Sequence, residues 1–162
     1  MSRFHLLSAL ALALFLPAIT AAQDRDTQEI QKYALTDAGL AKYSQATRKL
    51  AMLPAEESGA CDDAGDSLSI DETAAKLNSL PAAKSAIQEA GLTAREYVVF
   101  SFALLQTGLA VWGGDQAGGK PSSVSPANVA FYKKNEPNLK KLEALAAHPD
   151  CDDGEDDGED GE

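Results

Sequence analysis

The sequence predicts an all-α protein, a single compact domain of five to six helices around a central apolar helix. Apolar residues recur at helical spacing in several segments, and Ser, Thr or Pro stands where most of these segments begin. Pro and Gly interrupt the pattern between segments, as expected for turns. No internal repeat points to a solenoid.

Residues 1–22 have the pattern of a secretory signal peptide. A cationic start leads into an apolar stretch at residues 6–17, followed by the small residues Thr20 and Ala22 at the positions a signal peptidase reads. The apolar stretch is too short to span a bilayer. We therefore expect export to the periplasm or the medium, and a mature chain that begins at Gln23.

The first helix of the mature chain is expected at residues 37–53. Residues 30–35 are expected to form a short extended arm, and Thr36 is a good N-cap residue for the helix that follows. Pro54 prevents the helix from continuing. Residues 54–68 are rich in small and acidic residues without a period, so we expect a loop there.

Two short helices are expected next. Ser69 and Glu72 have the spacing of a capping box, which predicts a helix at residues 70–80. Proline suits the first turn of a further helix at residues 81–90, and Gly91 suits its left-handed C-cap.

Residues 97–112 form the most apolar segment and are expected to be the buried central helix. Thr93 and Glu96 repeat the capping box before it. Its length of 16 residues falls short of a transmembrane span, so we expect no span in the mature chain. Small residues should let a neighbouring helix approach one face. That face comprises Tyr97, Ser101, Leu104, Gly108 and Trp112.

The last helix is expected to begin at Pro126, with Ser125 as its N-cap, and to run to Ala146. Pro137 should kink or restart it. The predicted helical domain thus covers residues 23–149, and a disordered acidic tail follows at residues 150–162.

Charge excludes some classes of partner. The formal net charge is −11, and nine of the 25 acidic residues lie in residues 150–162. Nucleic-acid binding needs a basic face that this chain lacks, so we expect no nucleic-acid partner. The same charge argues against an anionic membrane surface.

Three segments resemble parts of uncharacterised small exported helical proteins of Gram-negative bacteria. They are LTAREY at residues 92–97, FALLQ at residues 102–106 and VSPANVAF at residues 124–131. The resemblance extends over residues 35–145, and its motifs are helix caps and core residues. It implies a helical fold and an exported location, and it carries no activity.

The residues offer little for catalysis. Removal of the signal peptide leaves His148 as the only histidine, so histidine-based nucleophilic or metal sites are hard to build. Residues 114–120 have the glycine and lysine spacing of a phosphate-binding loop, but Pro121 replaces the magnesium-binding hydroxyl. We expect a protein without enzymatic activity and without an obligatory cofactor.

Cys61 and Cys151 are the only cysteines, and in an oxidising compartment we expect them to form a disulfide. Each is followed by two aspartates, so the bond would gather carboxylates that suit Ca²⁺. A solvated acidic loop and tail without a bound ion is the alternative. The candidate calcium ligands are Asp62, Asp63, Asp66, Asp150, Asp152 and Asp153.

Two functions therefore compete. The first is a non-enzymatic module of the cell envelope that binds a protein or a small apolar ligand in a groove around the central helix. Its candidate lining residues are Tyr97, Phe100, Trp112 and Phe131. The second is an acidic envelope protein that binds Ca²⁺ through the aspartates beside Cys61 and Cys151.

Overall fold

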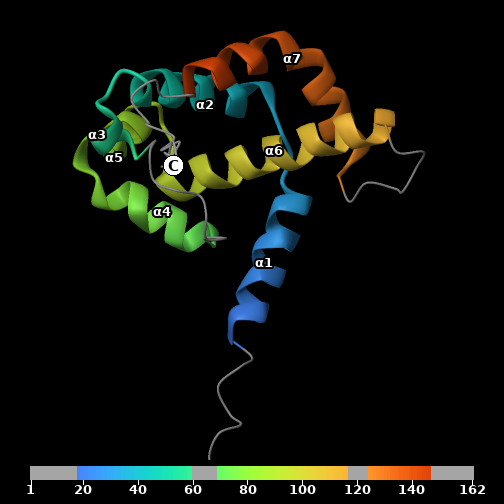
Figure 1. Ribbon diagram of the computed structural model, residues 1–162, viewed down its shortest axis with the longest axis horizontal. Coiled ribbons are helices and arrows are strands. Elements are labelled where there is room, and N and C mark those ends of the chain that lie inside the picture. Colours follow the sequence, from blue (N-terminus) through green and yellow to red (C-terminus); the bar gives the residue numbers. More distant parts are fainter. Residues whose placement is uncertain (1–17, 60–68, 117–123, 147–162) are drawn as a thin grey trace, which may run out of the picture.

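The computed structural model describes residues 18–59, 69–116 and 124–146, and it confirms a single compact all-α domain (Figure 1). Within these residues there are seven helices and no strand. The helices are α1 (Ala18–Lys32), α2 (Asp37–Leu50), α3 (Ala55–Ser58), α4 (Ile70–Ser79), α5 (Pro81–Glu89), α6 (Ala94–Gln116) and α7 (Pro126–Ala146).

The central helix of the fold is α6. It packs against α1, α2, α4, α5 and α7. In Figure 1, α6 crosses the middle of the molecule with α2 and α7 above it, α4 below it, and α1 projecting away from the body. The predicted arrangement around one apolar helix is therefore confirmed.

The predicted caps are also present. The Ser69 hydroxyl accepts from the Glu72 N–H (3.2 Å), and the Ser69 N–H donates to the Glu72 carboxylate (2.8 Å). Thr93 and Glu96 form the same reciprocal pair, at 3.2 and 2.8 Å. Gly91 has φ +78°, a conformation that glycine adopts without a Cβ penalty. These local signals fix where α4 and α6 begin and where α5 ends.

The largest buried side chain at the centre of the fold is Phe100, with 1% of its surface exposed. Tyr43 of α2 stacks on its ring with centroids 5.0 Å apart, and Tyr33 meets it edge-on at 6.0 Å. Gly39 of α2 comes so close that a Cβ there would lie 2.7 Å from the Phe100 ring. A glycine in α2 thus permits the close packing of α2 on α6.

The segment before α2 is partly helical, so the expected extended arm at residues 30–35 is wrong for its first half. α1 continues to Lys32, and residues 33–36 link it to α2. Asn128 of α7 fixes this link because its side chain accepts from the Leu35 N–H (3.0 Å) and donates to the Tyr33 carbonyl (2.8 Å). The buried amide of Asn128 thus satisfies two backbone groups of this link.

Contacts from distant residues hold α1 in place, and no local sequence pattern predicted them. The Ile70 N–H at the start of α4 donates to the buried carboxylate of Asp26 (2.8 Å). Arg95 binds the Glu29 carboxylate with two N–H groups and also binds Asp71. These bonds tie α1 to α4 and α6.

Two further boundaries differ from the prediction. The helix expected at residues 37–53 ends at Leu50, and turns follow to residue 53. The loop expected at residues 54–68 contains the four-residue α3 at its start, with Gly59 as a left-handed C-cap. One proline-initiated turn is too short to show helical periodicity in the sequence.

α6 is longer than predicted, because its capping box starts the helix at Ala94 and the glycines near its end do not stop it. It has 23 residues, and Ala94–Gly113 is long and apolar enough to cross a membrane by length and composition. The length of this helix therefore no longer argues against a membrane span. The many helices packed against α6 instead indicate a core helix.

α7 is one helix with Pro137 inside it. Proline removes one backbone hydrogen bond and bends a helix, and Figure 1 shows α7 curving over the body. Pro137 therefore kinks α7 and does not start a new helix.

Candidate functional site

The exposed apolar side chains of the C-terminal half of α6 form a row. Leu105, Leu109 and Trp112 have 58%, 61% and 64% of their surfaces exposed. Their spacing of four and three residues places them on one face of the helix. Single exposed leucines are common, but such a row is not.

This row borders a cavity of about 300 Å³ between α6 and α7, which we call the α6–α7 groove. The α6 side and Tyr43 of α2 face Tyr132, Leu139, Leu142 and Glu143 of α7. Its α6 lining residues are Ser101, Leu104, Leu105, Gly108, Leu109 and Trp112. The walls are chiefly aliphatic and aromatic, with a few polar groups, as in small-molecule sites.

Gly108 shapes the floor of the α6–α7 groove. A Cβ on Gly108 would lie 2.9 Å from the Tyr132 hydroxyl oxygen, so only glycine lets this ring lie against α6. The expectation that a small residue here admits a neighbouring helix is confirmed. Burial raises the pKa of the Tyr132 hydroxyl, and nearby Glu143 adds to the effect. The phenol therefore stays protonated and can donate a hydrogen bond.

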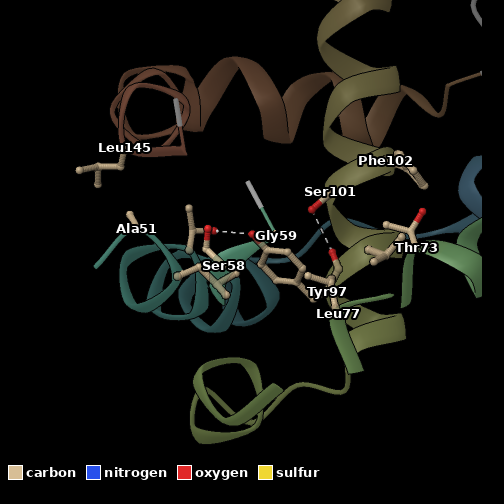
Figure 2. Close-up of a pocket in the computed structure, with 12 residues that line it drawn as sticks. Ala51, Ser58, Gly59, Thr73, Leu77, Tyr97, Ser101, Phe102 and Leu145 are labelled. Carbon is tan, nitrogen blue, oxygen red and sulfur yellow. Dashed lines mark hydrogen bonds between the residues drawn. The ribbon is translucent and has the colours of Figure 1, made fainter. Parts of the chain in front are cut away.

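A second cavity of about 240 Å³ adjoins the first, because Ser101 lines both. Figure 2 shows it between Tyr97 and Ser101 of α6, Ser58 and Gly59 at the end of α3, and Leu145 of α7. The Ser101 hydroxyl donates to the Tyr97 carbonyl (3.1 Å), drawn as a dashed line in Figure 2.

Polar groups in the second cavity are already paired. The Tyr97 hydroxyl lies 3.3 Å from the Thr47 hydroxyl, within hydrogen-bond distance. Burial raises the pKa of the Tyr97 phenol, so it remains neutral. A ligand in this cavity would therefore be recognised more by its shape than by hydrogen bonds.

The four aromatic residues expected to line one groove are separated. Trp112 lines the α6–α7 groove and Tyr97 lines the second cavity. Phe100 lines neither, because it lies in the core among the rings of Tyr33 and Tyr43. Phe131 packs against the same core and also lines neither cavity. Trp112 is exposed, so the expected burial of this end of the central helix is wrong.

Sequence reasoning missed Leu105 and Leu109 as lining residues. The run on α6 is apolar on all sides, which is typical of a fully buried helix, so its exposed face could not be told from its buried one. The row at spacing four and three was visible in the sequence, but only the positions of neighbouring helices show that this row is uncovered.

The cysteines and the candidate calcium ligands all lie outside the described residues, in residues 60–68 and 147–162. Among the residues that are described, no group of three acidic, histidine or cysteine side chains could hold a metal ion. Calcium binding through the six aspartates stays a prediction. A melting temperature that is unchanged between millimolar Ca²⁺ and EDTA would contradict it.

Comparison of the chain with protein-family models, with curated proteins and with solved structures gave no significant match.

Proposed function

We propose that the protein is an exported, non-enzymatic helical module that binds a partner protein or a small apolar ligand in the α6–α7 groove. The observation that carries this proposal is the row of Leu105, Leu109 and Trp112, exposed beside an apolar cavity of about 300 Å³. Contiguous exposed apolar surface with a polar rim is typical of interaction sites. The cavity volume falls at the lower end of the range for small-molecule sites.

The composition of the rest of the chain supports an occupant from outside it. Residues 60–68, 117–123 and 147–162 contain a single large aliphatic residue, Leu68, and no aromatic residue. Such segments carry too few apolar side chains to cover the groove. Residues 1–17 are apolar, but the proposed signal cleavage removes them.

Export is part of the same proposal, and the contacts of α1 are compatible with it. Cleavage after Ala22 would keep Arg25, Asp26 and Glu29, whose side chains tie α1 to α4 and α6. The mature N-terminal helix would therefore keep its anchoring bonds.

The positions of the residues beside the two cysteines support the proposed disulfide. Gly59 and Leu145 line the same cavity. Cys61 follows Gly59 by two residues and Cys151 follows Leu145 by six, a reach of roughly 20 Å for an extended chain. A bond between the two cysteines is therefore within reach without rearrangement of the described helices.

Binding of Nile red, a polarity-sensitive dye, tests the groove. We expect saturable binding to the purified mature protein and its loss in Leu109→Glu, because a carboxylate would then stand among the apolar walls. Met52→Glu is the matched control, since Met52 is 76% exposed and lines neither cavity. Equal dye binding by the wild type and Leu109→Glu would reject the groove as the site.

Intact mass tests export and the disulfide. The protein recovered after secretion should lack residues 1–22, and reduction should add the mass of two hydrogens. Retention of residues 1–22 would reject the signal peptide, and an unchanged mass on reduction would reject the disulfide.

A further inference from the structure

Tyr132 is a buried residue that lines the α6–α7 groove, and its hydroxyl lies beside Gly108, which lines the groove as well. Only 7% of the Tyr132 surface is exposed, and its oxygen lies against the bare backbone at Gly108. In the described part of the chain, no hydrogen bond to this hydroxyl is found, whereas the Tyr97 hydroxyl is within bonding distance of Thr47. Buried hydroxyls are nearly always paired, so Tyr132 is suited to donate to an acceptor that enters the groove.

The charges around Tyr132 limit what that acceptor can be. Glu143 lines the groove beside it, and Glu136 lies on the same helix, paired with Lys140 at 2.8 Å. A ligand carboxylate would be repelled by the Glu143 carboxylate, which lines the same groove. An ammonium head group could only donate to the Tyr132 oxygen, which would leave the phenol hydrogen without an acceptor. An uncharged carbonyl oxygen satisfies both conditions.

The apolar part of the site is elongated. Leu105 and Trp112 are seven positions apart on α6, which is about 10 Å along the helix axis. Leu139 and Leu142 of α7 face this track. An aliphatic chain laid along the track would bury the leucine side chains and the indole face.

We infer that the α6–α7 groove takes an uncharged amphiphile with a single aliphatic chain and a carbonyl oxygen that accepts from the Tyr132 hydroxyl. This inference rests on the proposed function and adds the chemical class of the ligand. The chain lies along Leu105, Leu109 and Trp112, and the carbonyl group lies at Tyr132.

Trp112 is the only tryptophan, so its fluorescence reports on this groove alone. The mature protein is titrated with decanamide, with decanoate of the same shape but negative charge, and with decylammonium. We expect decanamide to shift the Trp112 emission to shorter wavelength saturably, and to bind several-fold more tightly than either charged probe. Tyr132→Phe should weaken decanamide binding about fivefold by removing one hydrogen bond.

Two controls separate binding from folding. Tyr132→Phe should leave the melting temperature unchanged, and Tyr33→Phe, which lines neither cavity, should leave decanamide binding unchanged. Tighter binding of decanoate or decylammonium, or full decanamide binding by Tyr132→Phe, would overturn the inference. If decanamide fails to bind while Nile red still distinguishes the wild type from Leu109→Glu, the ligand class is wrong and the proposed function stands.

Discussion

Both halves of α6 contribute to the apolar run at residues 97–112 that predicted one buried helix, yet they are packed differently. In the N-terminal half, Val98, Phe100 and Ala103 expose no more than 3% of their surfaces. In the C-terminal half, Leu109 and Trp112 expose more than half of theirs. The difference shows that burial depends on which helices are available to cover a segment, and not on its hydropathy alone.

The number of neighbours explains this contrast. α1 and α4 supply Ile30, Ile70 and Ala74 around the start of α6, in a cluster with Val98 and Val99. Near the other end, α7 is the only one of the described helices that runs beside α6 in Figure 1. The N-terminal half of α6 therefore supports the fold, and the C-terminal half keeps an exposed apolar face.

The largest expected effect comes from truncating one aromatic residue in each half. Phe100→Ala should lower the free energy of unfolding by about 3–5 kcal/mol, because it opens a cavity in the core. Trp112→Ala should change it by less than about 0.5 kcal/mol, because the indole is mostly exposed. Chemical denaturation measures both. Similar losses from the two variants would show that the halves do not differ.

Two glycines of α6 allow a second comparison, between a position in contact with α7 and a position with free space around it. Gly108→Ala should destabilise by about 1–3 kcal/mol, because its Cβ would lie 2.9 Å from the Tyr132 hydroxyl oxygen. Gly113→Ala should stabilise by about 0.4–1 kcal/mol, because nothing lies within 4 Å and alanine favours the helix. Thermal unfolding distinguishes the two, and a stabilised Gly108→Ala variant would contradict the close contact of α7 with α6.

Substitution of Asp26 tests how α1 is anchored to α4, beside the N-terminal half of α6. Asp26→Ala should cost about 1–2 kcal/mol, because the Ile70 N–H at the start of α4 loses its buried acceptor. Asp24→Ala is the matched control on the same helix, since Asp24 is exposed. Equal stability of the two variants would mean that α1 is not held by this bond.

Acid should weaken the ion pairs that tie α1 and α4 to the N-terminal half of α6, and the expected loss of stability is smaller. Hydrogen bonds from Arg95 lower the pKa of Glu29 and of Asp71 below their usual values. A carboxyl whose pKa is lowered on folding stabilises above its unfolded pKa, near 4, and loses this contribution as the pH falls through the folded pKa. Arg95→Met should flatten the fall in melting temperature below about pH 4.5. An unchanged pH profile would show that these ion pairs do not stabilise α1.

How far the sequence could predict the molecule depended on whether a feature was local. The caps at Ser69, Thr93 and Gly91 are set by residues three positions apart or fewer, and they were predicted correctly. The bond from Ile70 to Asp26 and the contact of Tyr132 with Gly108 join residues that are far apart in the chain. No local sequence pattern could therefore predict them. The same reason explains why Phe100 was placed in the groove and Leu109 was not.

The central claim is that the C-terminal half of α6 leaves an uncovered apolar face. Acrylamide quenching of Trp112 in the ligand-free mature protein tests it most directly, since no other tryptophan contributes. We predict emission typical of a water-exposed indole, quenched nearly as efficiently as free tryptophan. Emission at short wavelength that resists acrylamide would contradict the claim, because it would mean that another segment or another copy of the chain already covers this face.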